Sequence, residues 1–414
     1  MNIANSLKNI FASTNFNKLK FDPRRTLIKQ AKVALNEGNL IVEFHDETEA
    51  YPSVWLRDNC TCPECFHNDS HSRAINWDKF DVGVSPISVD VNKDKLEIKW
   101  SDNHRSIFTE DWLRNRSFEG SKQAKYLEEN YRPKKILWDG TEFTKILKTY
   151  SYREVMTKDE ILYCFLKDLA IYGVVLLKDA PMDPSANSKL SQKIAFVRET
   201  HYGKEYVITS KPGTNNYAYL SSLLQQHTDL PYYEYNPGVV FLHYVVQTES
   251  EGGQNLLTDG FFVAEKMRRE MKEHFELLST VHVNWSDYGT EDFVKFCNIF
   301  RTPVISLDSF SEIASVRYSI PQRDSFFSVP LEKVTSWYHA LKEFTKLLDK
   351  HCAKFKVESG NILVFDNTRL THGRVQYNDT KGNQRYLVGN YMDWDEIYSK
   401  MRILKNEMQE KQQT

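Results

Sequence analysis

The chain has 414 residues, of which 41% are hydrophobic and 27% are charged, and its formal net charge is −2. This is the composition of an ordinary globular protein that is long enough for two domains. The small net charge offers no electrostatic attraction for nucleic acid or anionic lipid, and no stretch reaches the roughly eighteen apolar residues of a membrane span, so we expect small molecules as partners.

Residues 1–30 have the bias of a targeting segment. They contain Lys8, Lys18 and Lys20, whereas no acidic residue precedes Asp22. This bias favours a mitochondrial transit peptide, with a disordered tail as the alternative. Since the apolar core of a secretory signal is absent, we expect a mitochondrial protein, or otherwise a cytoplasmic one, rather than a secreted one.

Three of the six cysteines lie close together, at Cys60, Cys62 and Cys65. In a chain otherwise poor in cysteine, such a cluster more often binds a metal than forms disulfides. A structural Zn(II) ion takes four ligands in a closed tetrahedron, so one ligand is missing. On spacing alone, the candidates for it are His67, His71 and His104. The alternative is a redox-active or merely buried group of thiols.

Residues 31–115 are expected to form a small β domain around these cysteines. Short strand-like runs, Leu40–Phe44 and Leu96–Trp100, lie on either side of them. Residues 116–160 are charged and contain Arg132–Pro133, which favours a linker with short helices.

Residues 161–405 show a pattern of strands with helical insertions, and residues 406–414 are expected to be a short tail. From Leu331 to Phe355, apolar residues recur at helical spacing. This spacing predicts a helix that packs on the strands or lies at a subunit contact.

His227 and Asp229 form a His-x-Asp pair, and in a strand two residues so spaced project to the same side. His372, which follows the apolar run Asn361–Phe365, could complete the set from a distant strand. Two imidazoles and one carboxylate on one face of a metal leave the opposite positions open, as in the facial triad of non-haem Fe(II) oxygenases. Each residue alone has an ordinary structural explanation, but the combination favours a metal site.

Arg385 lies thirteen residues after His372, in the apolar stretch Gln384–Tyr391. A guanidinium group there could bind a carboxylate through two parallel hydrogen bonds, which suits the distal carboxylate of 2-oxoglutarate. A zinc-dependent hydrolase could also use two histidines and a carboxylate. It would, however, leave Arg385 unexplained.

Eight short segments carry a resemblance to a known family. They are His227–Pro231, Pro237–Gly238, Glu251–Gly253, Thr258–Phe261, Phe365–Asn367, Thr371–Arg374, Asp393–Asp395 and Arg402–Leu404. From about residue 40 onward, the chain resembles the γ-butyrobetaine dioxygenase and trimethyllysine dioxygenase family of 2-oxoglutarate-dependent hydroxylases. The last two segments are more similar to the γ-butyrobetaine branch.

The resemblance implies a mainly β fold with helical insertions, in which a double-stranded β-helix (jelly-roll) oxygenase core follows a small zinc-binding β domain. It also implies a homodimer. It selects His104 as the fourth zinc ligand, because Trp100–His104 matches the segment that supplies a distant histidine in the family. His104 would join the returning strand Lys95–Trp100 to the cysteine turn.

The resemblance also implies roles in catalysis. It assigns Fe(II) to His227, Asp229 and His372 and 2-oxoglutarate to Arg385, with ascorbate as the reductant. Arg374 either assists at the carboxylate of 2-oxoglutarate or braces its own loop, and we favour the second role.

An aromatic cage binds the trimethylammonium group of the substrate in the family, since aromatic faces attract such a cation without hydrogen bonds. The residues that align with this cage are Tyr202, Tyr206, Tyr219 and Tyr391. Without the resemblance, aromatic residues at these spacings would be read as core. Tyr206 stands where the family often has a tryptophan, and Asn216 matches a polar position near the substrate carboxylate.

Two departures from the family pattern concern the carboxylate end of the substrate. Leu230 replaces a tyrosine, and the segment Arg317–Arg323, around Pro321, is shorter by two residues that include an asparagine. A buried carboxylate with fewer hydrogen-bond donors binds more weakly. These departures bear on the identity of the substrate rather than on the oxidative chemistry.

The expected reaction is the hydroxylation of γ-butyrobetaine to L-carnitine in carnitine biosynthesis. The alternative within the family is the hydroxylation of N6-trimethyllysine, which carries the same cation. From other classes, an inactive binding module and a zinc hydrolase remain as alternatives, and dependence on 2-oxoglutarate would separate them from an oxygenase. A binding module would not need the four residues His227, Asp229, His372 and Arg385.

Overall fold

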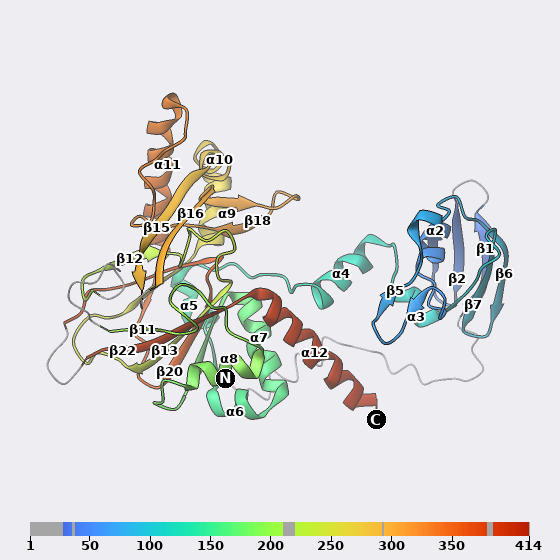
Figure 1. Ribbon diagram of the computed structural model, residues 1–414, viewed down its shortest axis with the longest axis horizontal. Coiled ribbons are helices and arrows are strands. Elements are labelled where there is room, and N and C mark those ends of the chain that lie inside the picture. Colours follow the sequence, from blue (N-terminus) through green and yellow to red (C-terminus); the bar gives the residue numbers. More distant parts are fainter. Residues whose placement is uncertain (1–27, 35–37, 210–219, 292–293, 379–383, 414) are drawn as a thin grey trace. The chain divides into compact units, whose positions relative to one another are not determined.

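The computed structural model describes residues 28–34, 38–209, 220–291, 294–378 and 384–413 (Figure 1). The chain divides into two compact units, Met1–Glu129 and Asn130–Thr414. Within the described ranges, no helix is both long and apolar enough to span a membrane.

The first unit contains two antiparallel sheets of three strands, and both contribute to one hydrophobic core. Buried and exposed residues alternate along their strands, because only one face of each sheet is covered. Its elements are β1 (Ile28–Ala34), β2 (Asn39–Phe44), β3 (Thr48–Pro52), α2 (Ser53–Asp58), β4 (Phe66–His67), β5 (Ser72–Arg73), η1 (Trp77–Lys79), β6 (Pro86–Asn92), β7 (Lys95–Trp100), β8 (Arg105–Thr109) and α3 (Glu110–Arg114). Helix α4 (Gly120–Asn130) follows them.

The second unit is built, within the described residues, on a six-stranded and a four-stranded sheet. The six-stranded sheet has the order β11 (Tyr206–Ile208), β22 (Tyr386–Met392), β13 (Val239–Val246), β20 (Asn361–Asp366), β10 (Val174–Lys178) and β9 (Lys148–Ser151). The four-stranded sheet has the order β12 (Leu224–His227), β21 (Leu370–Arg374), β14 (Asn255–Asp259) and β19 (Ala353–Phe355). Except for the parallel pair β9–β10, neighbouring strands in both sheets are antiparallel.

The two large sheets share a hydrophobic core, as in a two-layered β structure. Val240 and Leu242 of β13 belong to this core, together with Leu257 of β14. Val239 and Phe241 belong to a second core, which includes residues of four helices. Because β13 is covered on both faces, its sequence is a nearly unbroken apolar run.

Some helices of the second unit share a core with the six-stranded sheet, and others pack against one another at the far end of the unit (Figure 1). The helices are η2 (Gly140–Glu142), α5 (Phe143–Ile146), α6 (Tyr152–Thr157), α7 (Asp159–Tyr172), α8 (Ala186–Ile194), α9 (Gly260–Glu270), α10 (Lys272–Thr280), α11 (Leu331–Lys350) and α12 (Trp394–Gln413). Two further hairpins complete the unit, and their strands are β15 (Val283–Glu291), β16 (Val294–Thr302), β17 (Ile305–Leu307) and β18 (Ile313–Val316).

The structure differs in detail from the elements expected along the chain. The helix expected from Leu331 to Phe355 ends at Lys350, because residues 353–355 pair with β14 instead. Residues 406–413, expected as a tail, continue α12. Trp138 and Phe143, in the expected linker, belong to the core of the second unit.

A buried ion pair fixes the turn between β20 and β21. The Arg369 guanidinium donates from Nε and Nη2 to the carboxylate of Asp259, at 3.1 and 2.7 Å, and both side chains are fully buried. The same carboxylate accepts from the backbone N–H groups of Phe261 and Phe262 at the start of α9, and from that of Trp138. One charged pair therefore joins the turn, a helix and the segment before the first strand of the unit.

Replacing Asp259 with asparagine should destabilise the protein by about 3–5 kcal/mol, because Arg369 would keep a buried charge without a partner. Urea denaturation followed by tryptophan fluorescence measures the loss. The matched control is Glu270→Gln, which removes the exposed Lys266–Glu270 pair of the same helix and should leave the unfolding midpoint almost unchanged. Equal midpoints for both variants would contradict the assigned role of the pair.

Candidate active site

Two histidines and an aspartate meet at the edge of the four-stranded sheet. His227 ends β12 and is paired with His372 of β21 in the register of the sheet. Their Nε2 atoms lie 3.3 and 3.4 Å from Oδ1 of Asp229. The ligand atoms of the three residues all lie within 4.8 Å of one another. This donor set fits a divalent transition metal bound on one face.

His227 and Asp229 come together for a different reason from the strand alternation that the sequence suggested. Strand β12 ends at His227, so Asp229 does not share its alternation. Instead, the chain turns after the strand, with Leu230 at a φ of 52°. The turn is fixed by Thr228, whose backbone N–H donates to the carbonyl of Tyr318 at 2.7 Å. The carboxylate reaches the imidazoles through this turn.

Asn367 binds the same turn from the other side. Its side-chain oxygen accepts from the backbone N–H of Asp229 at 2.7 Å, and its amide group donates to the carbonyls of Asp229 and Pro237 at 3.0 Å. Asn367 is fully buried. The sequence indicated this residue only as part of a family segment, because a side-chain bond to a distant backbone leaves no pattern in a single sequence.

The charge states of the three residues depend on one another. Burial opposes the charge of His227, but its contact with Asp229 outweighs burial and raises the pKa of the imidazole. Burial opposes the charge of Asp229, but His372 and His227 outweigh it and hold the pKa of the carboxyl well below its usual range. Nδ1 of His227 lies 2.9 Å from the carbonyl of Gln225, so in the neutral imidazole this nitrogen carries the proton and leaves the lone pair of Nε2 for a metal. Burial lowers the pKa of His372, which favours the neutral imidazole that a metal requires.

Two buried arginines lie beside the triad. Arg385 precedes β22 and donates from Nε to the side-chain oxygen of Gln247 at 3.2 Å. Arg374 donates from Nη2 to the carbonyls of Leu220 and Ser222, at 2.6 and 2.7 Å. These bonds tie the Arg374 side chain to the segment of Leu220 and Ser222.

Arg374 also has unused hydrogen-bonding capacity. Its Nε and Nη1 are buried and have no hydrogen-bond partner within the part of the chain that the structure describes. Burial and the neighbouring charge of Arg385 lower the pKa of Arg374 to about 10. An anionic ligand would satisfy these donors and offset both charges, so the residues present fit a dicarboxylate such as 2-oxoglutarate.

A cavity of about 430 Å³ contains the triad, both arginines and several aromatic side chains. Three of the expected cage residues line it: the ring centroids of Tyr202 and Tyr206 are 6.1 Å apart, and those of Tyr206 and Tyr391 are 5.0 Å apart. Tyr219 and Asn216 lie outside the described residues. The sequence did not single out Tyr232, which also lines the cavity.

The positions that depart from the family pattern lie in the wall of this cavity. Leu230 and Pro321 both line it, as do the neighbours Ile320 and Gln322. Changes at these positions therefore alter the space around a substrate.

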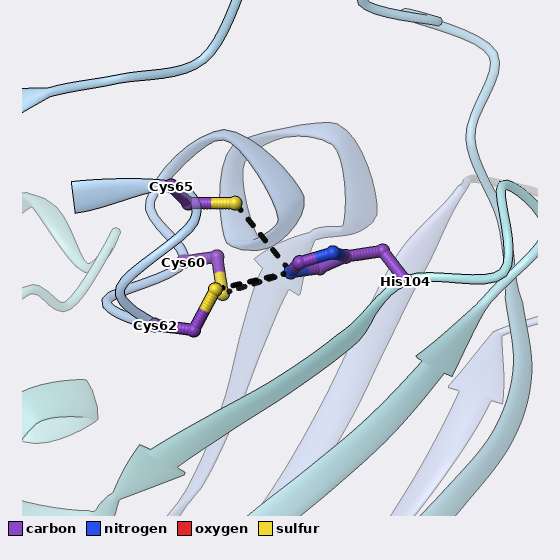
Figure 2. Close-up of side chains that lie close together, drawn as sticks. All are labelled: Cys60, Cys62, Cys65 and His104. Atoms are coloured by element: carbon purple, nitrogen blue, oxygen red, sulfur yellow. Dashed lines mark hydrogen bonds between the residues drawn. The ribbon is translucent and has the colours of Figure 1, made fainter.

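The cysteine cluster forms a second candidate metal centre, in the first unit (Figure 2). Nε2 of His104 lies 3.3 Å from Sγ of Cys60 and 3.5 Å from Sγ of both Cys62 and Cys65. His104 lies in the turn between β7 and β8, so the group joins this hairpin to the cysteine turn. His67 instead bonds to Ser70, and neither His67 nor His71 belongs to the group.

The comparisons with known proteins agree with this arrangement. The family model "Taurine catabolism dioxygenase TauD, TfdA family" matches residues 139–391, and "Gamma-butyrobetaine hydroxylase-like, N-terminal" matches residues 31–114. The γ-butyrobetaine dioxygenase of Homo sapiens is 35% identical over 92% of this chain and 98% of that protein. The chain belongs to this dioxygenase family.

Two further proteins are similar to this chain to a lesser degree. The mitochondrial trimethyllysine dioxygenase of Bos taurus is 28% identical over 89% of this chain and 86% of that protein. A solved asparagine oxygenase in complex with Fe(II), 2S,3S-3-hydroxyasparagine and succinate has a TM-score of 0.45 and 12% identity, covering 61% of this chain and 91% of that chain. At that TM-score, the second likeness adds nothing to the assignment.

Membership in this family confirms the predicted resemblance, including the greater similarity to the γ-butyrobetaine branch. It confirms that the chain is a dioxygenase, which argues against both a binding module and a zinc hydrolase. It also confirms the strand-rich oxygenase core of the second unit.

Gly389 leaves the space that the Tyr206 ring occupies, since a Cβ atom at Gly389 would lie 2.2–2.5 Å from that ring and its hydroxyl. Gly389→Ala should therefore displace Tyr206 from Tyr391 and cost about 1–3 kcal/mol of stability. A crystal structure of the variant checks the ring, and urea denaturation checks the cost. Gly120→Ala is the control, because no atom lies within 4 Å of the added group. An unmoved Tyr206 ring would refute the prediction.

Proposed function

We propose that this protein is an Fe(II)- and 2-oxoglutarate-dependent dioxygenase that hydroxylates γ-butyrobetaine to L-carnitine. The observation that supports it most is the single cavity in which the His–Asp–His group, two buried arginines and a set of tyrosine rings meet. The relative of 35% identity is a γ-butyrobetaine dioxygenase, which supports this substrate over the alternatives.

In this proposal, His227, Asp229 and His372 bind Fe(II) on one face. Bound Fe(II), with O₂ and 2-oxoglutarate as co-substrates, would supply the oxidising chemistry: 2-oxoglutarate loses CO₂ and takes one oxygen atom of O₂ to become succinate, and the other oxygen atom converts a substrate C–H bond to C–OH. Arg385 binds the distal carboxylate of 2-oxoglutarate. Arg374 fixes the loop at Leu220 and Ser222 and adds its charge near that carboxylate.

The substrate cation is bound by aromatic faces. The rings of Tyr202, Tyr206 and Tyr391 are neighbours in the wall of the cavity, where their faces would attract a cation without a counter-ion. The position of the bound cation then selects which C–H bond lies near the metal, so that orientation rather than acid–base catalysis determines the product.

Purified protein with Fe(II), ascorbate and 2-oxoglutarate should form equal amounts of succinate and hydroxylated product when γ-butyrobetaine is added. N6-trimethyllysine, tested in parallel, should react more slowly, because no described residue of the cavity is assigned as an acceptor for its α-amino group. Mass spectrometry measures both products. Faster turnover of trimethyllysine would reassign the substrate, and no coupled turnover with either would refute the proposal.

Replacing Arg385 with alanine should raise the KM for 2-oxoglutarate about ten- to a hundredfold, which corresponds to the roughly 1.5–3 kcal/mol of a hydrogen bond to a charged group. Steady-state succinate formation at varied 2-oxoglutarate measures it. The control is Arg301→Ala, which removes an exposed guanidinium bonded to Ser328. An unchanged KM for Arg385→Ala would exclude Arg385 from co-substrate binding.

We propose further that Cys60, Cys62, Cys65 and His104 bind a structural Zn(II) ion, because three thiols and an imidazole are a donor set of closed tetrahedral zinc sites. Cys62→Ser should lose the one zinc ion per chain and unfold at a lower temperature. Elemental analysis and thermal melting measure these changes. Cys297→Ser, which replaces an exposed cysteine, should keep the zinc. Equal zinc contents in the two variants would contradict the site.

The location and assembly are part of the same proposal. The lysine-rich, acid-poor residues 1–21 and the mitochondrial relative support import into mitochondria. Fractionation of cells that express the full chain tests the location, and light scattering tests the homodimer implied by the family resemblance.

A further inference from the structure

The two oxygen atoms of the Asp229 carboxylate have different surroundings. Oδ1 faces Nε2 of His227 and Nε2 of His372, at 3.3 and 3.4 Å. Oδ2 accepts a hydrogen bond from the hydroxyl of Tyr391 at 3.0 Å. The side chain is 18% exposed, so little water competes for either oxygen. The carboxylate is thus divided between a metal-facing oxygen and a protein-bonded one.

Tyr391 is in a rigid part of the fold. It lies in β22 opposite Val240 of the central strand β13, and only 3% of its surface is exposed. Its backbone carbonyl accepts from the N–H of Arg198 at 2.8 Å, and its ring packs against Tyr206. Because backbone and ring are both fixed, the hydroxyl is held at one place beside Asp229.

An aspartate can bind a metal through one oxygen or through both. A facial site works only while the positions opposite the protein ligands stay open for other ligands. A hydrogen bond to Oδ2 withdraws that oxygen and leaves Oδ1 as the ligand atom. Hydrogen-bond partners of ligand residues orient the ligand and often change metal affinity strongly when they are removed.

We propose that Tyr391 is a positioning residue for the metal ligand Asp229, in addition to its place among the aromatic rings of the cavity. Its hydroxyl determines which carboxylate oxygen faces the two imidazoles. Tyr391 therefore touches both halves of the site: its ring faces the region of the substrate cation and its hydroxyl binds the metal carboxylate. This inference rests on the proposed role of Asp229 as a metal ligand, but not on the identity of the substrate.

The test is the affinity of the full-length protein for Mn(II), measured by calorimetry without substrate. Tyr391→Phe keeps the ring and removes only the hydroxyl, so its dissociation constant for Mn(II) should rise about ten- to a hundredfold. The matched control is Tyr150→Phe. It removes another tyrosine-to-carboxylate hydrogen bond, to Asp168, which lies outside the cavity. Tyr150→Phe should bind Mn(II) as the unaltered protein does.

Circular dichroism establishes first that both variants fold. An unchanged affinity in Tyr391→Phe would overturn the inference, and so would an equal loss in both variants, because that would reflect a general change in stability. If the unaltered protein bound no Mn(II), both the inference and the proposed metal site would be wrong. If Mn(II) binding behaved as expected but γ-butyrobetaine were not turned over, only the proposed substrate would be wrong.

Discussion

The buried turn from Asp366 to Arg369 is the part of the second unit on which the site depends. Arg369 is paired with Asp259 and also donates to the carbonyls of Ile171 and Ile136, so the turn is joined to three distant segments. Asp366 accepts from the side chain and backbone of Thr368 and from the indole of Trp394. A buried charge with no partner would cost several kcal/mol, so arrangements that separate Arg369 from Asp259 are disfavoured.

This turn determines the position of the metal ligands from two directions. Its Asn367 binds the backbone of Asp229, and the strand that begins just after it carries His372. The ligands therefore come from segments about 140 residues apart in sequence. Both segments are held in place by the same short turn. A rigid common support of this kind is what a ligand set needs in order to keep open positions for other molecules.

The identity of the metal ligands could be predicted from the sequence, whereas their geometry and the residues that hold them could not. The residue types and spacing of His227, Asp229 and His372 indicate a chemistry, because few other uses require that set. Their geometry does not follow from strand alternation, since Asp229 lies in a turn that Thr228 and Asn367 fix through tertiary bonds. The roles of Asn367 and of the Tyr391 hydroxyl depend on which distant atoms they meet, and a single sequence does not contain that information. The helix end at Lys350 was missed because a short strand, residues 353–355, continues the apolar pattern.

The cavity separates its charges. The arginines line the cavity together with the metal ligands, and an anionic co-substrate would offset the guanidinium charges. The cation of the proposed substrate would instead meet tyrosine rings, whose attraction does not require a counter-ion. A cavity with a carboxylate in place of those rings would bind metal ions or the arginines themselves, and its selectivity would suffer.

The short stretch from Ser319 to Gln322 is a place where related enzymes can come to accept different substrates. Just before it, Tyr318 is bonded to Thr228, and Arg317 donates to the carbonyls of Pro231 and Glu234, so the metal-binding turn is secured there. The stretch itself lies in the cavity wall and outside both large sheets. Residues can be gained or lost within it while the oxidising centre keeps its geometry. Natural selection can therefore change what fits into the cavity by altering one loop, without having to rebuild the chemistry.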